Sequence, residues 1–310
     1  MNLLLTGGAG FIGSILADAL IGDGHNVTII DDLSTGRNEN IPQKAEFHKL
    51  DISSPVVDKI FERGKFDQVF HLAAQMDVRK SVQNPVFDAD VNILGGINLL
   101  QASVKYKVKK FIFSSTGGAI YGEQDYFPAD ENHPANPVSP YGVSKLALEK
   151  YLYYYHAEHK LPYVSLRYAN VYGPRQNEKG EAGVVAIFCS RLLKGEKAVV
   201  NGDGLQTRDF VYVDDVVKSN LLAMRYDKNG CLNVGTGLET DINTVFEMIK
   251  TATGSKQKRI NGPAKPGEQR RSCITYDLIQ KEMGWSPSVS LDGGIRKTVD
   301  YFRSKIKIRV

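Results

Sequence analysis

Short apolar and β-branched runs alternate with longer segments of helical periodicity through the first half of the chain. The runs lie at residues 2–6, 26–30, 45–50, 68–72, 110–113 and 163–167. Between them, apolar residues recur every three to four positions, which is the spacing of a helix that packs on one side. This alternation predicts an α/β fold, a Rossmann-type doubly wound parallel sheet with helices on both faces.

The pattern becomes irregular after about residue 170. We expect residues 1–169 to form the Rossmann domain, with later segments returning to it, and residues 170–310 to form mainly a smaller, mixed C-terminal substrate lobe. Ligands of open α/β sheets bind at the carboxyl ends of the strands, so candidate chemistry is sought directly after each strand. The lobe is expected to contain a Gly-, Asn- and Glu-rich loop, a helix, a short strand and two further helices, at 173–183, 184–194, 198–200, 213–226 and 242–251.

The composition is that of an ordinary globular protein, with 42% hydrophobic and 24% charged residues among 310. The net charge is only +4 and no platform of aromatic and basic residues is found, so nucleic-acid binding is not expected. No apolar run is long enough to cross a bilayer, and the first residues do not resemble a secretory leader. Cys189, Cys231 and Cys273 lie far apart and form no CxxC pair. We therefore expect a cytoplasmic protein with no membrane segment and no metal site.

A glycine-rich turn follows the first expected strand, with Gly7, Gly10 and Gly13 directly before a helix. Glycines there allow a tight turn and close approach of the backbone to a pyrophosphate at the helix N-terminus. The triplet is weak evidence by itself, because glycine-rich turns are common. The second expected strand, however, ends at Asp31, 24 residues after Gly7, where a carboxylate accepts hydrogen bonds from the ribose of a dinucleotide. A carboxylate repels a ribose 2′-phosphate, so NAD rather than NADP is predicted.

A tyrosine and a lysine four residues apart, Tyr141 and Lys145, are candidates for proton transfer. Residues four apart share a helix face, so the ammonium would lie near the phenol. That cation, helped by the positive nicotinamide ring, would lower the pKa of the phenol from about 10 toward that of a general base. The same spacing occurs by chance at Tyr106/Lys110 and Tyr301/Lys305. What distinguishes Tyr141 is the strand some 25 residues upstream, which ends in hydroxyl residues at 114–116.

Motifs along nearly the whole chain resemble the extended short-chain dehydrogenase/reductase family, most closely its UDP-glucose 4-epimerases and related NDP-sugar epimerases. The motifs are TGGAGFIGS (6–14), DDLSTG (31–36), HLAAQ (71–75), SSTGGAIYG (114–122), YGVSK (141–145), RYANVYGPRQ (167–176), RDFVYVDD (208–215) and NVGTG (233–237). The resemblance implies an NAD-dependent isomerase that interconverts UDP-glucose and UDP-galactose at C4.

The resemblance also implies the roles of three catalytic residues. Tyr141 would take the proton of the sugar 4-hydroxyl while hydride passes to NAD, and Lys145 would hold the nicotinamide ribose and tune Tyr141. Thr116 would donate to or accept from the reacting oxygen. The 4-keto sugar would then turn over in the pocket and receive the hydride on its other face. The 114–122 segment is one residue longer than the commonest epimerase form, so Ser115 is an alternative to Thr116 as the hydroxyl partner.

Two sets of binding residues follow from the same resemblance. Asp51 and Ile52 would lie at the adenine, Tyr168 beside the nicotinamide, and Arg208 on the diphosphate, for which its fork of donors is suited. The cofactor set is Gly7, Gly10, Phe11, Ile12, Gly13, Asp31, Asp32, Leu33, Ser34, Thr35, Gly36, Asp51, Ile52, Leu72, Ala73, Ala74, Asn92, Ser114, Tyr141, Lys145 and Tyr168. The substrate set is Thr116, Asn170, Val184, Val185, Arg208, Lys265, Glu268 and Ser272. The family often has Arg in place of Lys265.

The choice of reaction depends on the segment at 116–122, which contains no acidic residue. Related dehydratases and decarboxylases generally carry one there, so its absence favours plain 4-epimerisation. Alternatives on the same scaffold are a uronic acid epimerase or a 4-keto-sugar reductase. A non-catalytic nucleotide-binding protein is a further alternative, although the intact Thr116, Tyr141 and Lys145 argue against it.

Three further expectations concern substrate width, assembly and a strand-end histidine. Ser272 stands where epimerases restricted to unacetylated hexoses carry a bulky tyrosine, so UDP-N-acetylglucosamine is also expected to be accepted.

By resemblance, the tyrosine-rich helix around 151–155 and the helix near 92–106 would form a four-helix interface in a homodimer. His71, at the end of an expected strand, is interpreted as a packed residue rather than a catalytic or metal-binding one.

Overall fold

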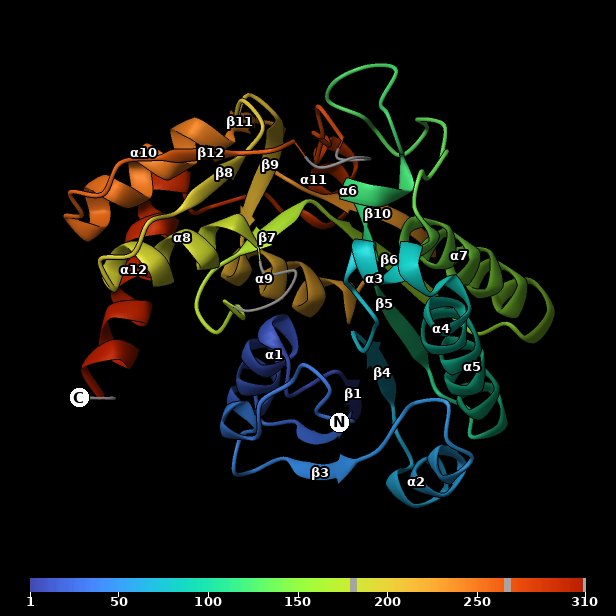
Figure 1. Cartoon of the computed structure of the whole chain (residues 1–310). Coiled ribbons are helices and arrows are strands. Elements are labelled where there is room, and N and C mark those ends of the chain that lie inside the picture. The colour runs from blue at the N-terminus through green and yellow to red at the C-terminus, as the bar shows by residue number, and fades with distance from the viewer. Residues whose placement is uncertain (179–182, 265–268, 309–310) are drawn as a thin grey trace.

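The computed structural model describes residues 1–178, 183–264 and 269–308, and its centre is a seven-stranded parallel sheet (Figure 1). The strand order is β10-β6-β5-β4-β1-β2-β3. The strands are β1 Asn2–Thr6, β2 Asn26–Asp31, β3 Glu46–Lys49, β4 Gln68–His71, β5 Lys110–Thr116, β6 Tyr163–Tyr168 and β10 Gly230–Val234. The expected Rossmann-type α/β fold is confirmed.

Each face of this sheet is covered by its own set of helices and its own apolar core. Leu3 and Leu5 of β1 point into one core and Leu4 into the other, because successive strand residues face opposite sides. A strand buried on both faces needs an unbroken apolar run, which β1 has. The first core is packed by α1 Phe11–Gly22, α9 Val213–Ala223 and α11 Asp277–Met283. The second is packed by α2 Val56–Gly64, α5 Gly95–Lys105 and α7 Pro140–His159.

The strand β10 was not among the runs expected from periodicity. It pairs in parallel with β6, with Leu232 opposite Leu166, and extends the sheet at that edge. Its five residues, GCLNV, contain too few apolar positions to stand out locally. Pairing with a strand more than sixty residues earlier defines it, and that contact is not visible in the local sequence.

A smaller lobe lies at the upper left in Figure 1, built on short sheets and three helices. One sheet has the order β11-β9-β7 and the other pairs β12 with β8. Phe188 and Phe246 meet edge to face in its core, with ring centroids 5.5 Å apart. The elements are β7 Asn170–Tyr172, α8 Val184–Leu193, β8 Val199–Asn201, β9 Thr207–Tyr212, β11 Glu239–Asp241, α10 Ile242–Thr253, β12 Ile260–Gly262 and α12 Leu291–Ile308.

The carboxyl ends of β1 and β4 mark the point where the strand order reverses, and short helices gather along this edge. Such a switch point is where open α/β sheets bind nucleotides. The short elements are η1 Asn38–Asn40, α3 Val78–Gln83, α4 Pro85–Ala89, the π-helix η2 Asp90–Leu94 and α6 Gly117–Ile120. The long helix α7 begins here, capped by the Ser139 hydroxyl, which accepts from Gly142 N.

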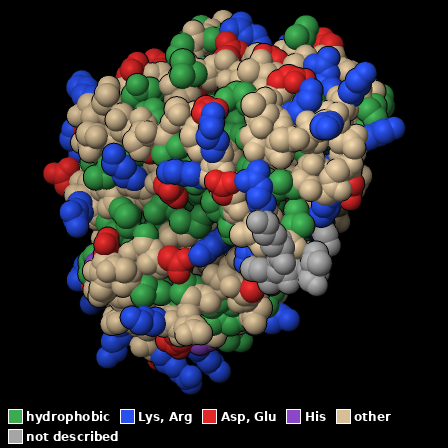
Figure 2. All heavy atoms as spheres, turned by 90° about the vertical axis from the view of Figure 1, so that its left-hand side faces the viewer, with side chains coloured by type: hydrophobic (Ala, Val, Ile, Leu, Met, Phe, Trp, Pro, Cys, Tyr) green, Lys and Arg blue, Asp and Glu red, His purple; other side chains and the backbone are tan. Residues whose placement is uncertain are grey.

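One face of the molecule carries charged side chains of both signs without separating them (Figure 2). Figure 2 shows Lys and Arg side chains scattered among Asp and Glu over the face that it presents. In the smaller lobe, Arg270 forms an ion pair with Asp203, and Arg271 forms one with Glu239. Within the three described ranges, no helix is both long and apolar enough to cross a membrane.

Candidate active site

The glycine turn after β1 is shaped by close backbone contacts. Gly7 has φ +73°, and a Cβ on it would lie 2.6 Å from Ala73 N. A Cβ on Gly13 would collide with the Gly7 carbonyl oxygen. Only glycine therefore lets the turn fit between the segment after β4 and the first turn of α1, where Phe11 and Ile12 begin the helix. The resulting cradle at the N-terminus of α1 fits a pyrophosphate.

Asp31, at the end of β2, braces this turn. Its carboxylate accepts from Ala9 N at 3.0 Å and from Leu33 N at 2.9 Å. Burial raises its pKa, and the two backbone N–H groups oppose that shift. A Cβ on Gly36 would lie 2.8 Å from the Asp31 carboxylate, so the loop at 32–36 folds tightly over the acid. Within that loop, Asp32 accepts from both the backbone N–H and the hydroxyl of Ser34.

The other predicted cofactor residues line the ends of β3 and β4. Asp51 is exposed and accepts from Ser53, while Ile52 is buried. Leu72, Ala73 and Ala74 follow β4, and Ala73 N donates to the Thr6 hydroxyl at 3.2 Å. Asn92 in η2 is buried and bonds both backbone groups of Gln75 at 2.9 Å. Asn92 therefore fixes the position of the 72–75 segment.

Tyr141 and Lys145 lie together at the start of α7, below the end of β5. The ammonium of Lys145 donates to the Ser114 carbonyl oxygen at 2.8 Å. It also lies 4.7 Å from the centroid of the Phe113 ring and 5.8 Å from that of Tyr141. The predicted pair and the strand-end segment are thus brought to the same edge of the sheet, as their order in the chain predicted.

The protonation of this pair differs from the expectation. Burial raises the pKa of the Tyr141 phenol, and the negative charge of Asp88 raises it further. The pKa of Lys145 falls to about 8 because burial disfavours the ammonium, which Asp88 and Glu149 partly offset. The predicted lowering of the Tyr141 pKa includes the charge of the nicotinamide ring, so for the NAD-bound protein it stays a prediction. Desolvation outweighs the attraction of one lysine whose ammonium is directed at a carbonyl.

The two candidate hydroxyl partners at the end of β5, Ser115 and Thr116, differ in their exposure. Ser115 is 3% exposed, whereas Thr116 is partly exposed where β5 runs into α6. A Cβ on Gly118 would lie 3.9 Å from the Thr116 hydroxyl and 3.7 Å from the Asn170 side-chain oxygen. Thr116 and Asn170 therefore flank one small space beside Gly118, which favours Thr116 as the group that reaches a substrate.

Tyr168 occupies the position opposite Thr116 on the neighbouring strand β6. It is buried, and its hydroxyl accepts from the Asn220 side chain at 2.8 Å. Burial raises the pKa of this phenol, so it is neutral at physiological pH. Tyr168 thus lies between the sheet and α9 and is not open to solvent, and its predicted place beside the nicotinamide stays a prediction.

Apart from Thr116 at the end of β5, the predicted substrate residues that the structure describes belong to the segments after residue 169. Val184 and Val185 begin α8, and the Val185 side chain is packed in the lobe's core, so only its backbone is offered to a ligand. Arg208 lies on β9 and donates to the Thr207 carbonyl. Ser272 is buried on the adjacent extended segment, where its carbonyl accepts from Asp209 N at 3.0 Å. The predicted Lys265 and Glu268 lie outside the described residues.

A buried ion pair behind the site was not predicted. Glu149, one turn after Lys145 on α7, binds Arg167 of β6 with 2.6 Å between Oε2 and Nη2. Arg167 also donates to the Tyr121 hydroxyl, which donates to Asn233 of β10 at 2.7 Å. The motifs at 114–122, 167–176 and 233–237 thus meet in one network. The polar residues that these three motifs place in strands were the signal in the sequence from which this network could have been inferred.

Asp209 is a second buried acid. It lies in the motif at 208–215, but no role was predicted for it from the sequence. Its carboxylate accepts from the Thr236 backbone and hydroxyl and from Gly237 N. Burial raises its pKa to about 6 in spite of these donors. Asp209 joins β9 to the 233–237 turn, directly beside Arg208.

His71 is packed at the end of β4, as interpreted from the sequence. It is buried, lies 2.8 Å from the Thr6 hydroxyl, and stacks on Phe113 with ring centroids 5.5 Å apart. Burial and the nearby Lys145 lower its pKa to about 3, so it is a neutral ring. Among the described residues, no three His, Cys, Asp or Glu side chains are grouped as metal ligands.

A model of the NAD dependent epimerase/dehydratase family matches residues 3–235. The chain belongs to this family. The UDP-glucose 4-epimerase of Mycolicibacterium smegmatis is 43% identical over 311 residues, which cover 98% of this chain and 99% of that protein. The family resemblance inferred from the motifs is therefore confirmed.

Solved structures of the family are similar over almost the whole chain. The UDP-glucose 4-epimerase of Thermotoga maritima with UDP-glucose is 48% identical with a TM-score of 0.98, covering 99% of this chain and 100% of the other. That of Thermus thermophilus in complex with NAD is 44% identical with a TM-score of 0.94, covering 98% and 99%. A UDP-N-acetylglucosamine 4-epimerase from Methanobrevibacter ruminantium is 38% identical with a TM-score of 0.93, covering 98% of each chain.

Proposed function

We propose that this protein is an NAD-dependent epimerase that interconverts UDP-glucose and UDP-galactose at C4. The observation that carries the proposal is the hydrogen bond from Lys145 to the Ser114 carbonyl, which ties the turn of α7 that carries Tyr141 to the end of β5, the strand that ends at Thr116. Family membership and close likeness to UDP-glucose 4-epimerases support the substrate class. The absence of an acidic residue at 116–122 supports epimerisation rather than elimination of water.

The reaction requires one base and a reversible hydride acceptor. NAD bound at the glycine turn would supply the reversible hydride acceptor for C4 of the sugar. Tyr141 takes the proton of the 4-hydroxyl and gives it back, and Thr116 shares a hydrogen bond with the same oxygen. Lys145 binds the nicotinamide ribose while it is held by the Ser114 carbonyl. The positive charge of the cofactor then acts against the burial that raises the pKa of Tyr141 in the chain alone.

The UDP moiety is assigned to the smaller lobe, which we propose to comprise mainly residues 170–310, with residues 1–169 as the main NAD-binding part. Asn170 begins β7, Val184 begins α8, and Arg208 lies on β9, which is hydrogen-bonded to β7. Arg208 offers a fork of donors to the diphosphate, and the backbone N–H groups at Val184 and Val185 offer a helix N-terminus. Lys265 and Glu268 are proposed as a second clamp by family resemblance.

We propose that UDP-N-acetylglucosamine and UDP-N-acetylgalactosamine are substrates as well. Ser272 is small, and its segment runs beside β9, which carries Arg208. Likeness to a UDP-N-acetylglucosamine 4-epimerase supports this wider range.

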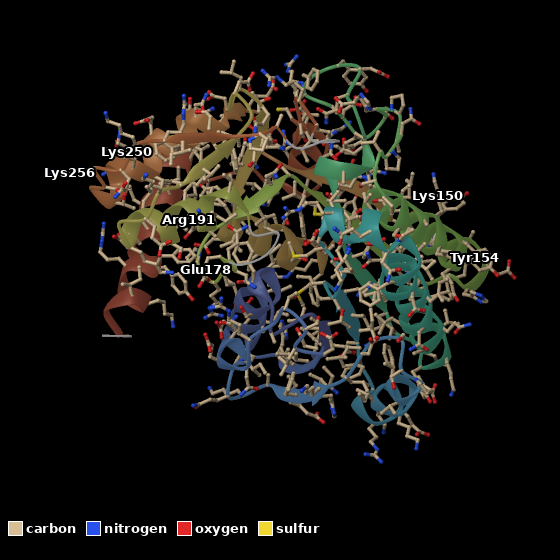
Figure 3. The ribbon with its side chains drawn as sticks, viewed as in Figure 1. Lys150, Tyr154, Glu178, Arg191, Lys250 and Lys256 are labelled. Carbon is tan, nitrogen blue, oxygen red and sulfur yellow. The ribbon has the colours of Figure 1, made fainter. Side chains whose placement is uncertain are left out.

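The proposed assembly is a homodimer through α5, α7 and the short helices before α5. Apolar side chains are exposed along this side, namely Val82, Val86, Phe87, Leu94, Tyr151 and Tyr154. Figure 3 shows Tyr154 and Lys150 on the outer side of α7, pointing away from the sheet. Exposed apolar surface of this kind is typical of a protein interface. A cytoplasmic location is proposed because all three cysteines are free.

The decisive experiment is to incubate the purified protein with UDP-galactose without added NAD and to measure UDP-glucose. An epimerase recycles its bound cofactor, so we expect many turnovers per subunit. A 4-keto-sugar reductase, the main alternative on this scaffold, would consume reduced cofactor and leave the UDP-hexose unchanged. The absence of UDP-glucose formation in protein shown to contain NAD would refute the proposal. Tyr141→Phe serves as the inactive control.

A further inference from the structure

Asp88 in α4 is a fully buried carboxylate that joins three parts of the site. It is 0% exposed. Its Oδ2 accepts from the Ser144 hydroxyl at 2.7 Å, and its Oδ1 accepts from the side chains of Gln75 at 2.9 Å and Asn92 at 3.0 Å. All three donors are neutral side chains, so none of these hydrogen bonds is an ion pair.

The three donors come from segments that must keep a fixed geometry for hydride transfer. Ser144 belongs to the same turn of α7 as Tyr141 and Lys145. Gln75 belongs to the segment after β4 that packs against the glycine turn, and Asn92 holds the backbone of Gln75 from η2. The cofactor side and the catalytic helix are thus tied to the same carboxylate. A further bond joins this helix to α3, from Tyr141 N to the Ser81 hydroxyl at 3.2 Å.

The charge of Asp88 acts on both members of the catalytic pair. It favours the ammonium of Lys145, whose pKa is otherwise lowered by burial, and it disfavours the phenolate of Tyr141. Two other ionisable groups face Lys145: Glu149 from α7, which is paired with Arg167, and the neutral His71 from β4. Asp88 is therefore the nearby acid whose charge is not already neutralised by an arginine.

We propose that Asp88 is a positioning residue for the reaction, because its buried carboxylate fastens the start of α7 to the cofactor segment after β4 and keeps Lys145 charged beside Tyr141. This inference rests on the proposed epimerase function. Its two effects, mechanical and electrostatic, can be separated because Asn has the shape of Asp. In Asp88→Asn the amide oxygen can still accept from Gln75 and Asn92, and the amide N–H can donate to the Ser144 hydroxyl oxygen.

The test compares Asp88→Asn with Ser144→Ala, which removes one bond and keeps the charge. Removing the charge lowers the pKa of both Tyr141 and Lys145, so both limbs of the pH profile of kcat should move to lower pH, by about one pH unit. Ser144→Ala should leave both limbs in place and lower kcat alone. If the pH profile of kcat for Asp88→Asn coincides with that of wild type, the electrostatic part of the proposal is wrong.

A second measurement does not depend on activity. Hydrogen–deuterium exchange of the NAD-bound protein should be faster at 139–145 and at 72–77 in Asp88→Ala than in wild type, and close to wild type in Asp88→Asn. Unchanged exchange in Asp88→Ala would overturn the fastening role. If wild type fails to epimerise UDP-galactose, the proposed function fails, and the exchange data still decide whether Asp88 holds the helix. If Asp88→Ala does not fold, the Asp88→Asn profile remains the test.

Discussion

The carboxylate of Glu149 lies 2.6 Å from the guanidinium of Arg167, and both side chains are almost completely buried, at 3% and 9% exposure. Glu149 also accepts from the Ser165 hydroxyl at 2.8 Å, and Arg167 reaches the Tyr121 hydroxyl at 2.9 Å. The ion pair joins the catalytic helix α7 to β6. These hydrogen bonds give the pair polar partners on both sides, which is the condition under which a buried pair is tolerated.

We expect Glu149→Ala to lower the free energy of unfolding by about 3–5 kcal/mol, because Arg167 is left charged and buried without a partner. Urea denaturation measures this. The matched control is Arg296→Ala, which breaks the exposed pair with Asp292 on α12 and should change the free energy of unfolding far less, because water screens exposed charges. Equal losses in the two variants would contradict the burial argument.

Tyr141→Phe should reduce kcat by about 10² to 10⁴-fold, because the 4-hydroxyl proton loses its acceptor. The fold should remain that of wild type, since Phe keeps the ring and removes only the hydroxyl. Tyr301→Phe is the control: it lies in a second Tyr-x-x-x-Lys sequence, on α12, far along the chain from the site. Comparable activity of Tyr141→Phe and Tyr301→Phe would remove Tyr141 from the mechanism.

Asp209 should make the protein less stable as the pH rises through the weakly acidic range. Its pKa is about 6 in the folded chain and 3.8 in the reference state, so the folded state binds the proton more tightly. The stability that this group contributes is complete below about pH 4 and lost as the pH passes 6, a change of roughly 3 kcal/mol. Urea unfolding of wild type and Asp209→Asn between pH 4 and 7 should show their difference changing with pH. A constant difference would contradict the raised pKa.

Ser272→Tyr should abolish turnover of UDP-N-acetylglucosamine while UDP-galactose is still converted, because a bulky ring fills the space for the acetyl group. The measurement is kcat/KM for both sugars in wild type and variant. Ser272→Ala keeps the small volume and should preserve both activities. Negligible activity of wild type on the acetylated sugar would rule out the wider substrate range.

Val86→Asp should convert the proposed dimer to a monomer, because Val86 is 78% exposed at the centre of the apolar side of α4 and a buried unpaired charge there is costly. Analytical ultracentrifugation measures the mass. Leu238→Asp introduces the same charge at a position 69% exposed in the smaller lobe and should leave the assembly unchanged. A wild-type protein that sediments as a monomer at micromolar concentration would refute the interface.

The sequence determined what depends on neighbours along the chain. Apolar periodicity predicted the first six strands of the sheet, and the glycines, Asp31 and the Tyr141/Lys145 spacing predicted a dinucleotide site with a proton-transfer pair. These signals are local, because a helix face or a turn depends on residues a few positions apart. Which residues contact NAD and the UDP-sugar is still a prediction based on the family motifs.

Only the tertiary structure decided the features that join distant segments. The strand β10 exists through its pairing with β6, and Asp88 matters because Gln75, Asn92 and Ser144 converge on it. The raised pKa of Tyr141, opposite to what its neighbour Lys145 suggested, follows from desolvation by the whole fold. Burial, and with it the cost of holding a charge, is set by everything that packs around a group, and the order of residues along the chain does not specify it.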